Sequence, residues 1–364
     1  MAKHLLTKLI SVLALNGILI TASALQAETS TAFGKMGPYR VVMSEVSDQG
    51  ILLVPVIKAG TDIKTAKQWP GIVFCHGLCG SAKMYSKSLE RLCSWGFVII
   101  ANQEQEDCGV VNLRRPMQSL NAVHKFQYCV NSPVMAANIE RNLHYLASRN
   151  DVNPDKLALV GHSMGGGVSI DVATSVNEQQ PGYIKAVVGI APWNGAQPTP
   201  SSVVGKLAVP LLIFCSMADK ICPCSGRATA VDIAVDSSPF PRLASRFEGR
   251  GMAYLFGSGA DPYWHGGSEA IYKNARSATL VEVLKTNHFA IAGTDGKQME
   301  HLAYQMASVQ GFGVNLEKKP YNWVPTLEYS VAFLYETLGI NPEAGKSAME
   351  TIDNDDRIAK VYSK

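Results

Sequence analysis

The stretch Leu157-Ala-Leu-Val-Gly-His-Ser-Met-Gly-Gly-Gly167 decides the fold of this chain. It holds the pattern G-x-S-x-G, centred on Ser163, directly after an apolar run and directly before a helical stretch. In that context the pattern forms a sharp strand-to-helix turn, and its glycines let the strand and the helix approach closely. The serine hydroxyl then stands at a helix N-terminus, where the helix dipole favours developing negative charge. We therefore predict Ser163 as a nucleophile; the alternative is a glycine-rich turn that only packs.

Short apolar runs alternate with helical patterns on both sides of this stretch. The predicted strands are residues 40–46, 51–57, 71–76, 97–101, 157–160, 185–190, 209–215 and 279–284. Such alternation predicts an α/β fold, with a mostly parallel central sheet and helices on both faces. We expect one domain over residues 28–340, ending in an amphipathic last helix near 327–338. An excursion at about residues 225–275 is interpreted as a lid, and residues 341–364 as a charged C-terminal tail.

Residues 1–27 have the pattern of a signal peptide. Lys3 and Lys8 precede an apolar run, and small residues allow cleavage after Ala24 or Ala27. An N-terminal membrane anchor is the alternative, but the run is short for a span, and no later segment is predicted to cross a membrane. We expect an exported protein, secreted or periplasmic. Removing both lysines lowers the formal net charge from +3 to +1, and the absence of a basic cluster predicts no nucleic-acid partner.

The chain contains 8 cysteines, an even number that fits disulfide formation in an exported protein. Cys75 and Cys215 lie in strand-like apolar runs and are predicted to be buried thiols. The better disulfide candidates lie in predicted loops: Cys79, Cys108, Cys129, Cys222 and Cys224. Their pairing stays open. A zinc site is the alternative, which the loose spacing and the lack of adjacent histidines disfavour, so no metal is predicted.

A serine hydroxyl needs a base to accept its proton, and in this kind of fold the acid and then the base follow the serine in the chain. His288, after the strand predicted at 279–284, is the expected base, with His265 and His301 as alternatives. For the acid we favour Asp219, which follows the apolar run 209–215. Asp261 follows a similar run nearer to the histidine, so this choice remains open.

Two backbone amides are expected to bind the oxyanion of the reaction. One is the amide of Met164, the residue after the nucleophile. The other is the amide of Leu78 in the segment His76-Gly-Leu-Cys-Gly80, whose glycines allow amides to turn inward. His76 precedes the serine in the chain, so we interpret it as structural rather than as the base.

Several islands of sequence resemble known ester hydrolases. Gly161-His-Ser-Met-Gly-Gly-Gly167, Ala191-Pro-Trp193, Val209-Pro-Leu-Leu-Ile213 and Asn287-His-Phe289 resemble the cutinase-like polyester hydrolases. Phe74-Cys-His-Gly-Leu78 and Trp95-Gly-Phe97 resemble the platelet-activating-factor acetylhydrolases and chlorophyllases. The resemblance covers roughly residues 38–340 as an order of motifs, and all three groups have the α/β-hydrolase fold.

The resemblance implies Ser163, Asp219 and His288 as a triad, Leu78 and Met164 as oxyanion donors, and Trp193 as a wall of the acyl pocket. Trp193 has a second interpretation, as an aromatic side chain that fills space. Polyester hydrolases carry an aromatic residue where Leu78 stands, and their segment between acid and histidine is shorter.

The expected activity is hydrolysis of a small-molecule, lipid or polymeric carboxylic ester, without a cofactor. A lipase or phospholipase, an acyltransferase and a non-catalytic binding protein are the alternatives. The sequence does not choose an oligomeric state.

Overall fold

The computed structural model describes residues 30–57, 68–77, 80–102, 133–192, 201–216, 219, 222, 224, 267–284, 286, 288, 290–293 and 324–364. The segment predicted as a signal peptide lies outside these residues, as do Cys79, Cys108 and Cys129. Within the described part of the chain, no helix is long and apolar enough to span a bilayer.

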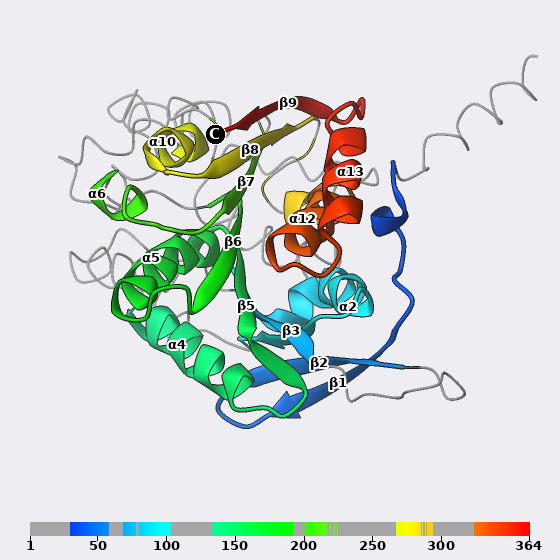
Figure 1. Ribbon diagram of the computed structural model, residues 1–364, viewed down its shortest axis with the longest axis vertical. Helices are drawn as coiled ribbons and strands as arrows, with labels where there is room; N and C mark the ends of the chain where they lie inside the picture. The colour runs from blue at the N-terminus through cyan, green and yellow to red at the C-terminus, as the bar shows by residue number, and fades with distance from the viewer. Residues whose placement is uncertain are drawn as a thin grey trace, which may run out of the picture.

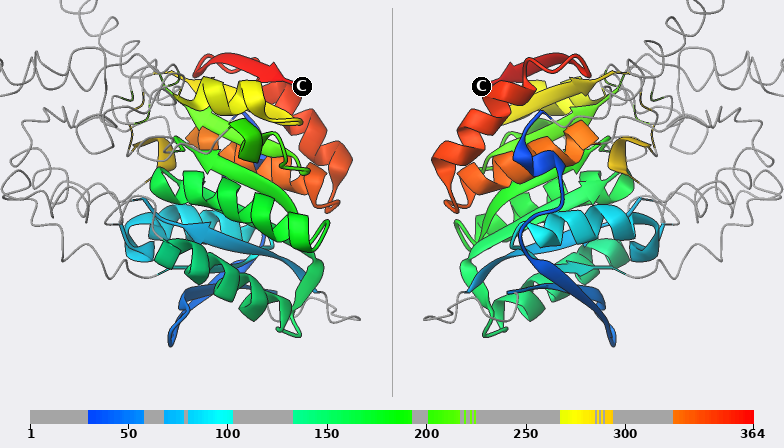
Figure 2. Two further views of the ribbon diagram at one scale, coloured as in Figure 1. Left: turned by 90° about the vertical axis from the view of Figure 1, so that its left-hand side faces the viewer. Right: turned by 90° about the vertical axis from the view of Figure 1, so that its right-hand side faces the viewer.

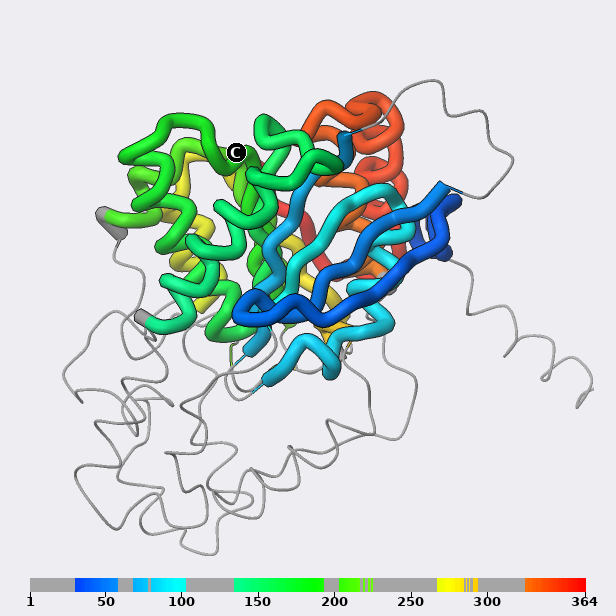
Figure 3. The backbone as a smooth tube through the Cα atoms, turned by 90° about the horizontal axis from the view of Figure 1, so that it is seen from below, coloured from blue at the N-terminus to red at the C-terminus, as the bar shows by residue number. Residues whose placement is uncertain are grey.

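The described strands form one mixed sheet. They are β1 (Arg40–Val46), β2 (Gly50–Val56), β3 (Trp69–Cys75), β4 (Val98–Ala101), β5 (Val152–His162), β6 (Ile184–Ile190), β7 (Leu211–Cys215), β8 (Ala278–Val283) and β9 (Ile358–Ser363). Their order in the sheet is β1-β2-β4-β3-β5-β6-β7-β8-β9. The six central strands pair in parallel, whereas β1, β2 and β9 are antiparallel at the two edges. Figure 3 shows β1 and β2 side by side as the blue pair of strands.

Helices cover both faces of this sheet (Figure 1). One face carries α4 (Pro133–Ala147), α5 (Met164–Gln179), α6 (Ser201–Val204) and α10 (Gly267–Asn274). The other carries α2 (Ser86–Ser94), α12 (Val324–Thr337) and α13 (Pro342–Ile352), and Figure 2 shows the two faces in turn. The predicted α/β fold with a mostly parallel sheet is therefore confirmed.

Each face of the sheet has its own hydrophobic core, because side chains alternate along a strand. In β3, Ile72 and Phe74 belong to the core under α2 and α12, whereas Val73 and Cys75 belong to the core under α4 and α5. Every residue of β3, β4 and β7 is buried, as expected for strands with both faces covered. This explains why these segments are continuous apolar runs in the sequence.

The prediction for residues 341–364 is wrong. Instead of a tail, they form α13 and then β9, which pairs antiparallel with β8. Gly345, Ala348 and Ile352 are buried at helical spacing, and a Cβ at Gly345 would lie 2.5 Å from the Ala332 carbonyl oxygen of α12. The charged residues of α13 and β9 lie on the exposed side, so the segment is rich in charge, as a tail would be. Its few apolar residues are spaced so that they join the core.

Two other elements differ from the sequence interpretation. The excursion expected at about 225–275 ends in α10, which contacts β7 and β8 and forms part of the crossover between these parallel strands. Residues 225–266 lie outside the described residues. The expected last helix, α12, is buried along most of its length and is followed by α13.

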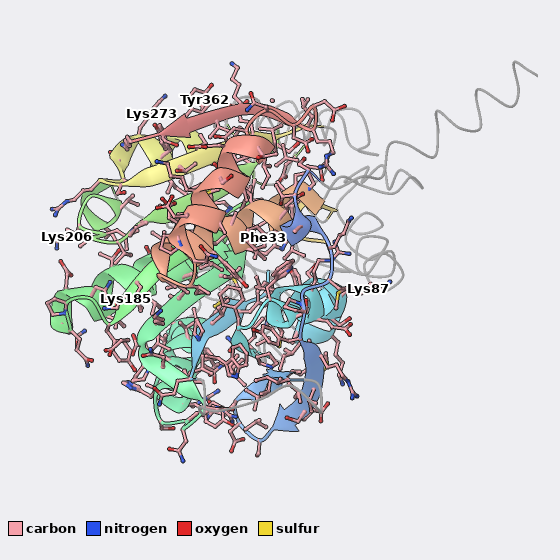
Figure 4. The ribbon with its side chains drawn as sticks, turned by 45° about the vertical axis from the view of Figure 1, so that its right-hand side comes forward. Phe33, Lys87, Lys185, Lys206, Lys273 and Tyr362 are labelled. Atoms are coloured by element: carbon pink, nitrogen blue, oxygen red, sulfur yellow. A yellow bond between two sulfur atoms is a disulfide. The ribbon has the colours of Figure 1, made fainter. Side chains whose placement is uncertain are left out.

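The segment before β1 packs against α12. Thr31 donates hydrogen bonds to the buried Glu328 carboxylate, through its hydroxyl at 2.6 Å and through its backbone amide. Phe33 contacts the rings of Trp95 and Tyr335, with both centroid distances 4.8 Å. Figure 4 shows Phe33 beside these helices, while Lys87, Lys185, Lys206 and Lys273 project from the periphery.

Candidate active site

The turn between β5 and α5 holds Ser163 in a conformation that few residues adopt. Its φ is 55° and its ψ is −122°, and α5 begins at the next residue, Met164. A Cβ at Gly161 would lie 2.3 Å from the Gly165 carbonyl oxygen, and one at Gly165 would lie 2.3 Å from the Cys75 carbonyl oxygen. Both glycines are therefore required by direct backbone contact, and this turn (residues 161–165, called the elbow below) has the geometry of a nucleophile elbow.

His288 lies between Ser163 and Asp219, although these residues come from the ends of three different strands. Its Nε2 is 2.9 Å from the Ser163 Oγ, and its Nδ1 is 2.8 Å from the Asp219 Oδ2. A carboxylate only accepts hydrogen bonds, so Nδ1 donates to Asp219 and Nε2 is left to accept from the serine hydroxyl. All three side chains are buried. The arrangement can take a proton from the serine and stabilise the cation that results.

Asp219 is held by the residues around it in the segment 216–224, which we call the acid loop. Its backbone amide donates to the Ser216 carbonyl at 3.1 Å, and its Oδ1 accepts from the Cys222 amide at 2.9 Å. The Ser216 hydroxyl donates to the Thr286 carbonyl at 2.8 Å, which ties the acid loop to the segment that carries His288. Asp261, the alternative acid, lies outside the described residues, as do His265 and His301.

A disulfide closes the acid loop. Cys215, the last residue of β7, is bonded to Cys224, and their Cα atoms are 5.1 Å apart. The prediction that Cys215 is a free thiol is wrong, because the chain after β7 returns to the strand end. Cys222, a disulfide candidate, is instead a buried free thiol, whereas Cys75 is a buried thiol as predicted.

Comparison with known families agrees with this architecture. The family model named chlorophyllase matches residues 30–207, just under half of the chain, from the segment before β1 to the end of α6. No curated protein matches the chain at a significant level. The chlorophyllase family has the α/β-hydrolase fold and implies an esterase or hydrolase. Together with the sheet and the elbow, the match decides the superfamily.

The chain has the α/β-hydrolase fold.

A thiol lies beside Ser163. The Cys222 side chain is fully buried and forms a hydrogen bond with the Ser163 side chain. Burial and the nearby Asp219 carboxylate raise the pKa of the Cys222 thiol well above its ordinary value, while the hydrogen bond acts in the opposite direction. The thiol is therefore neutral and packs as a small polarisable group against the serine.

Two further histidines of the hydrolase are buried near the elbow. His76 Nδ1 lies 2.8 Å from the Gly77 carbonyl oxygen, and burial lowers the pKa of His76 to about 4. Burial, and secondarily the neighbouring His288, lower the pKa of His162 well below its ordinary value. Both rings are thus neutral at pH 7. His76 makes no hydrogen bond with Ser163 among the described contacts, which agrees with its interpretation as structural.

The predicted oxyanion and pocket residues are described only in part. Met164 is the first residue of α5 and is buried. Leu78 and Trp193 lie outside the described residues. Gly77 is described, and its carbonyl accepts the Gly80 amide at 2.9 Å.

Sequence reasoning missed three residues near the serine. Cys222 follows Asp219 by three positions, but nothing in that spacing indicates a contact with Ser163. His162 occupies a variable position of the G-x-S-x-G pattern. Tyr85 is buried directly before α2, and the polar atom of a buried tyrosine is the signal that a partner is needed.

Proposed function

We propose that this α/β-hydrolase is an exported serine esterase that cleaves carboxylic esters, with Ser163, His288 and Asp219 as its catalytic triad. The observation that carries the proposal is the hydrogen bonding of the His288 ring on both sides, at 2.9 Å to the serine and 2.8 Å to the aspartate. A buried serine, imidazole and carboxylate in this order support acyl transfer through a covalent intermediate.

The proposed reaction has two steps. His288 Nε2 takes the Ser163 proton as the serine oxygen attacks the ester carbonyl, and Asp219 holds the ring and stabilises its positive charge. The amides of Met164 and Leu78 bind the oxyanion, and His288 then passes its proton to the departing alcohol. In the second step His288 takes a proton from water, which attacks the acyl group, and the proton returns to Ser163 as the acid leaves. No cofactor takes part.

The substrate class is proposed from the family match and from the composition. The esters are small-molecule, lipid or polymeric, with Trp193 as a wall of the acyl pocket. A near-neutral chain without a basic cluster supports an uncharged ester rather than a polyanion. Export is supported by the sequence of residues 1–27 and by the Cys215–Cys224 disulfide, because disulfides persist in oxidising compartments.

Hydrolysis of p-nitrophenyl acetate and butyrate tests the nucleophile. We expect Ser163→Ala to lose at least about 10³-fold in kcat and to lose labelling by a fluorophosphonate. Ser175→Ala is the matched control, because its hydroxyl lies on the same helix and bonds only to the Val172 carbonyl among the described contacts. Equal rates for wild type and Ser163→Ala would refute the proposal.

A hydrolysis profile then tests the substrate class. The panel contains esters of increasing acyl length, a phospholipid, a polyester and chlorophyll, the compound for which the matched family is named. Hydrolysis of at least one ester that depends on Ser163 is expected. Labelling by the fluorophosphonate without hydrolysis of any ester would contradict the assignment as an esterase while retaining the nucleophile.

A further inference from the structure

Four residues near the elbow form a continuous chain of buried hydrogen bonds. The Gly77 amide donates to the Tyr85 hydroxyl oxygen at 3.1 Å, and that oxygen lies 2.8 Å from the His162 Nδ1. On the other side of the same ring, His162 Nε2 lies 2.8 Å from the backbone carbonyl oxygen of His288. The chain of bonds therefore begins at the Gly77 amide and ends on the backbone of His288, the proposed base.

Only one placement of protons satisfies these four groups. The His288 carbonyl can only accept, so His162 Nε2 must carry a hydrogen. Because the imidazole is neutral, its Nδ1 has a lone pair and accepts the Tyr85 hydroxyl hydrogen. The Tyr85 oxygen in turn accepts the Gly77 amide. The His288 carbonyl therefore fixes which nitrogen of His162 is protonated, and Tyr85 supplies the hydrogen that the His162 Nδ1 accepts.

The surrounding packing keeps this phenol in place. Tyr85 is 3% exposed, and its ring contacts Phe74 at a centroid distance of 4.9 Å and His162 at 5.7 Å. A Cβ at Gly77 would lie 3.1 Å from the Ser163 Cβ and 3.4 Å from the Tyr85 hydroxyl. The turn, the phenol and the serine thus meet with no room for an extra methyl group.

We propose that Tyr85 is a positioning residue that joins Gly77, the residue before the proposed oxyanion donor Leu78, to the proposed catalytic histidine through His162. The inference rests on the proposed function, because it assigns Tyr85 a role through the oxyanion donor Leu78 and the base His288. Tyr85 itself touches neither of these groups in the described contacts. It acts by holding the amide that precedes Leu78 and, through His162, the backbone of His288.

Replacing Tyr85 with phenylalanine removes the hydroxyl and keeps the ring. We expect kcat for p-nitrophenyl acetate to fall roughly 10- to 100-fold, which is less than the loss of a direct oxyanion donor, and KM to change less than about 3-fold. Tyr335→Phe is the matched control, because the Tyr335 hydroxyl donates to the Trp95 carbonyl at 2.7 Å and takes no part in the site. The kcat of this variant should be unchanged. An unchanged kcat in Tyr85→Phe would overturn the proposal.

A double-mutant cycle with His162 tests whether the two residues act together. In His162→Gln the side-chain NH2 can replace the Nε2 donor to the His288 carbonyl. In His162→Asn the shorter side chain can replace only the Nδ1 acceptor for Tyr85. We expect the glutamine variant to be the more active of the two. Adding Tyr85→Phe to His162→Gln should cost less than about 3-fold more. The full Tyr85→Phe loss in that background would show that Tyr85 acts independently of His162.

Nitrogen NMR of histidine-labelled protein tests the proton placement without any measurement of activity. In wild type, His162 should show a protonated Nε2 and an unprotonated, hydrogen-bonded Nδ1 at pH 7. In Tyr85→Phe, Nε2 should stay protonated, and the Nδ1 signal should shift because that nitrogen has lost its donor. His162→Gln assigns the signals and still permits the test if Tyr85→Phe does not fold. A protonated Nδ1 in wild type would overturn the proposal. Activity that survives Ser163→Ala would refute the esterase proposal instead, while the NMR result still stands for the hydrogen-bond chain.

Discussion

The nucleophile elbow and the acid loop hold their side chains in different ways. In the elbow, backbone packs on backbone, because Gly161 and Gly165 approach carbonyl oxygens too closely for any side chain. In the acid loop, Asp219 is held by side-chain bonds and by the Cys215–Cys224 disulfide. The elbow is thus fixed by close backbone contacts, within the turn and with the end of β3, and the acid loop by hydrogen bonds and a crosslink. A mutation should therefore damage the fold at the elbow and the chemistry at the acid loop.

The largest expected effect tests the acid loop. Asp219→Asn keeps the shape of the side chain and removes the charge that stabilises the His288 cation, so kcat should fall about 10⁴-fold with the folded state preserved. The same measurement on Asp261→Asn supplies the control and decides between the two aspartates. A larger loss in Asp261→Asn would move the acid out of the acid loop.

The next prediction concerns the elbow. A methyl group at Gly165 would lie 2.3 Å from the Cys75 carbonyl oxygen and 2.5 Å from the His76 carbonyl oxygen, and neither backbone can yield. We expect Gly165→Ala to lower the free energy of unfolding by at least about 3 kcal/mol, measured by urea denaturation.

Gly189→Ala is the matched control for the elbow. The nearest atom to its added Cβ is 3.4 Å away on the Pro192 side chain, which is an ordinary contact. Its free energy of unfolding should change by less than about 1 kcal/mol. Similar losses of unfolding free energy in Gly165→Ala and Gly189→Ala would show that close backbone contact does not determine the conformation of the elbow.

The same difference explains what could be predicted from the sequence. The elbow is encoded within eleven residues, so the pattern around Ser163 led directly to the strand, the turn and the helix. The central strands were likewise visible, because burial on both faces leaves continuous apolar runs such as residues 71–75. The position of His288 followed from chain order after the last parallel strand.

The acid loop could not be predicted in this way. The return of the chain that brings Cys224 to Cys215 and Cys222 to Ser163 depends on contacts that no local pattern records. Residues 341–364 were misinterpreted for a related reason, because an edge strand such as β9 and an amphipathic helix such as α13 contribute few apolar residues. The Tyr85 hydroxyl likewise acquires a role only when His162 lies beside it in the folded chain.

A third prediction removes the crosslink. The double variant Cys215→Ala/Cys224→Ala opens the acid loop, so we expect a loss of about 2–3 kcal/mol in unfolding free energy. Because Asp219 lies inside this loop, kcat should also fall, by roughly 10-fold. Cys93→Ala is the control, since it removes a buried free thiol elsewhere and should leave kcat unchanged. Full activity in the double variant would show that the side-chain bonds of Asp219 suffice.

The smallest expected effect concerns His76, whose protonation state beside the elbow makes the free energy of unfolding depend on pH. Burial lowers the pKa of His76 from 6.5 to about 4, so the unfolded chain binds a proton at pH 5 that the folded chain does not. This contribution to stability is complete above pH 6.5 and is lost as the pH falls towards 4. Between pH 8 and pH 5 it amounts to about 2 kcal/mol.

Urea denaturation at several pH values measures this contribution. The fall in unfolding free energy between pH 8 and pH 5 should be about 2 kcal/mol smaller in His76→Gln than in wild type. His144→Gln is the control, because His144 is exposed on α4 and its replacement should leave the slope as in wild type. Because the His76 backbone lies against Gly165, a histidine that could take up a proton there would have to admit water beside the elbow. Equal slopes in wild type and His76→Gln would mean that His76 binds its proton equally well in the folded and the unfolded chain, so that burial beside the elbow does not keep its ring neutral.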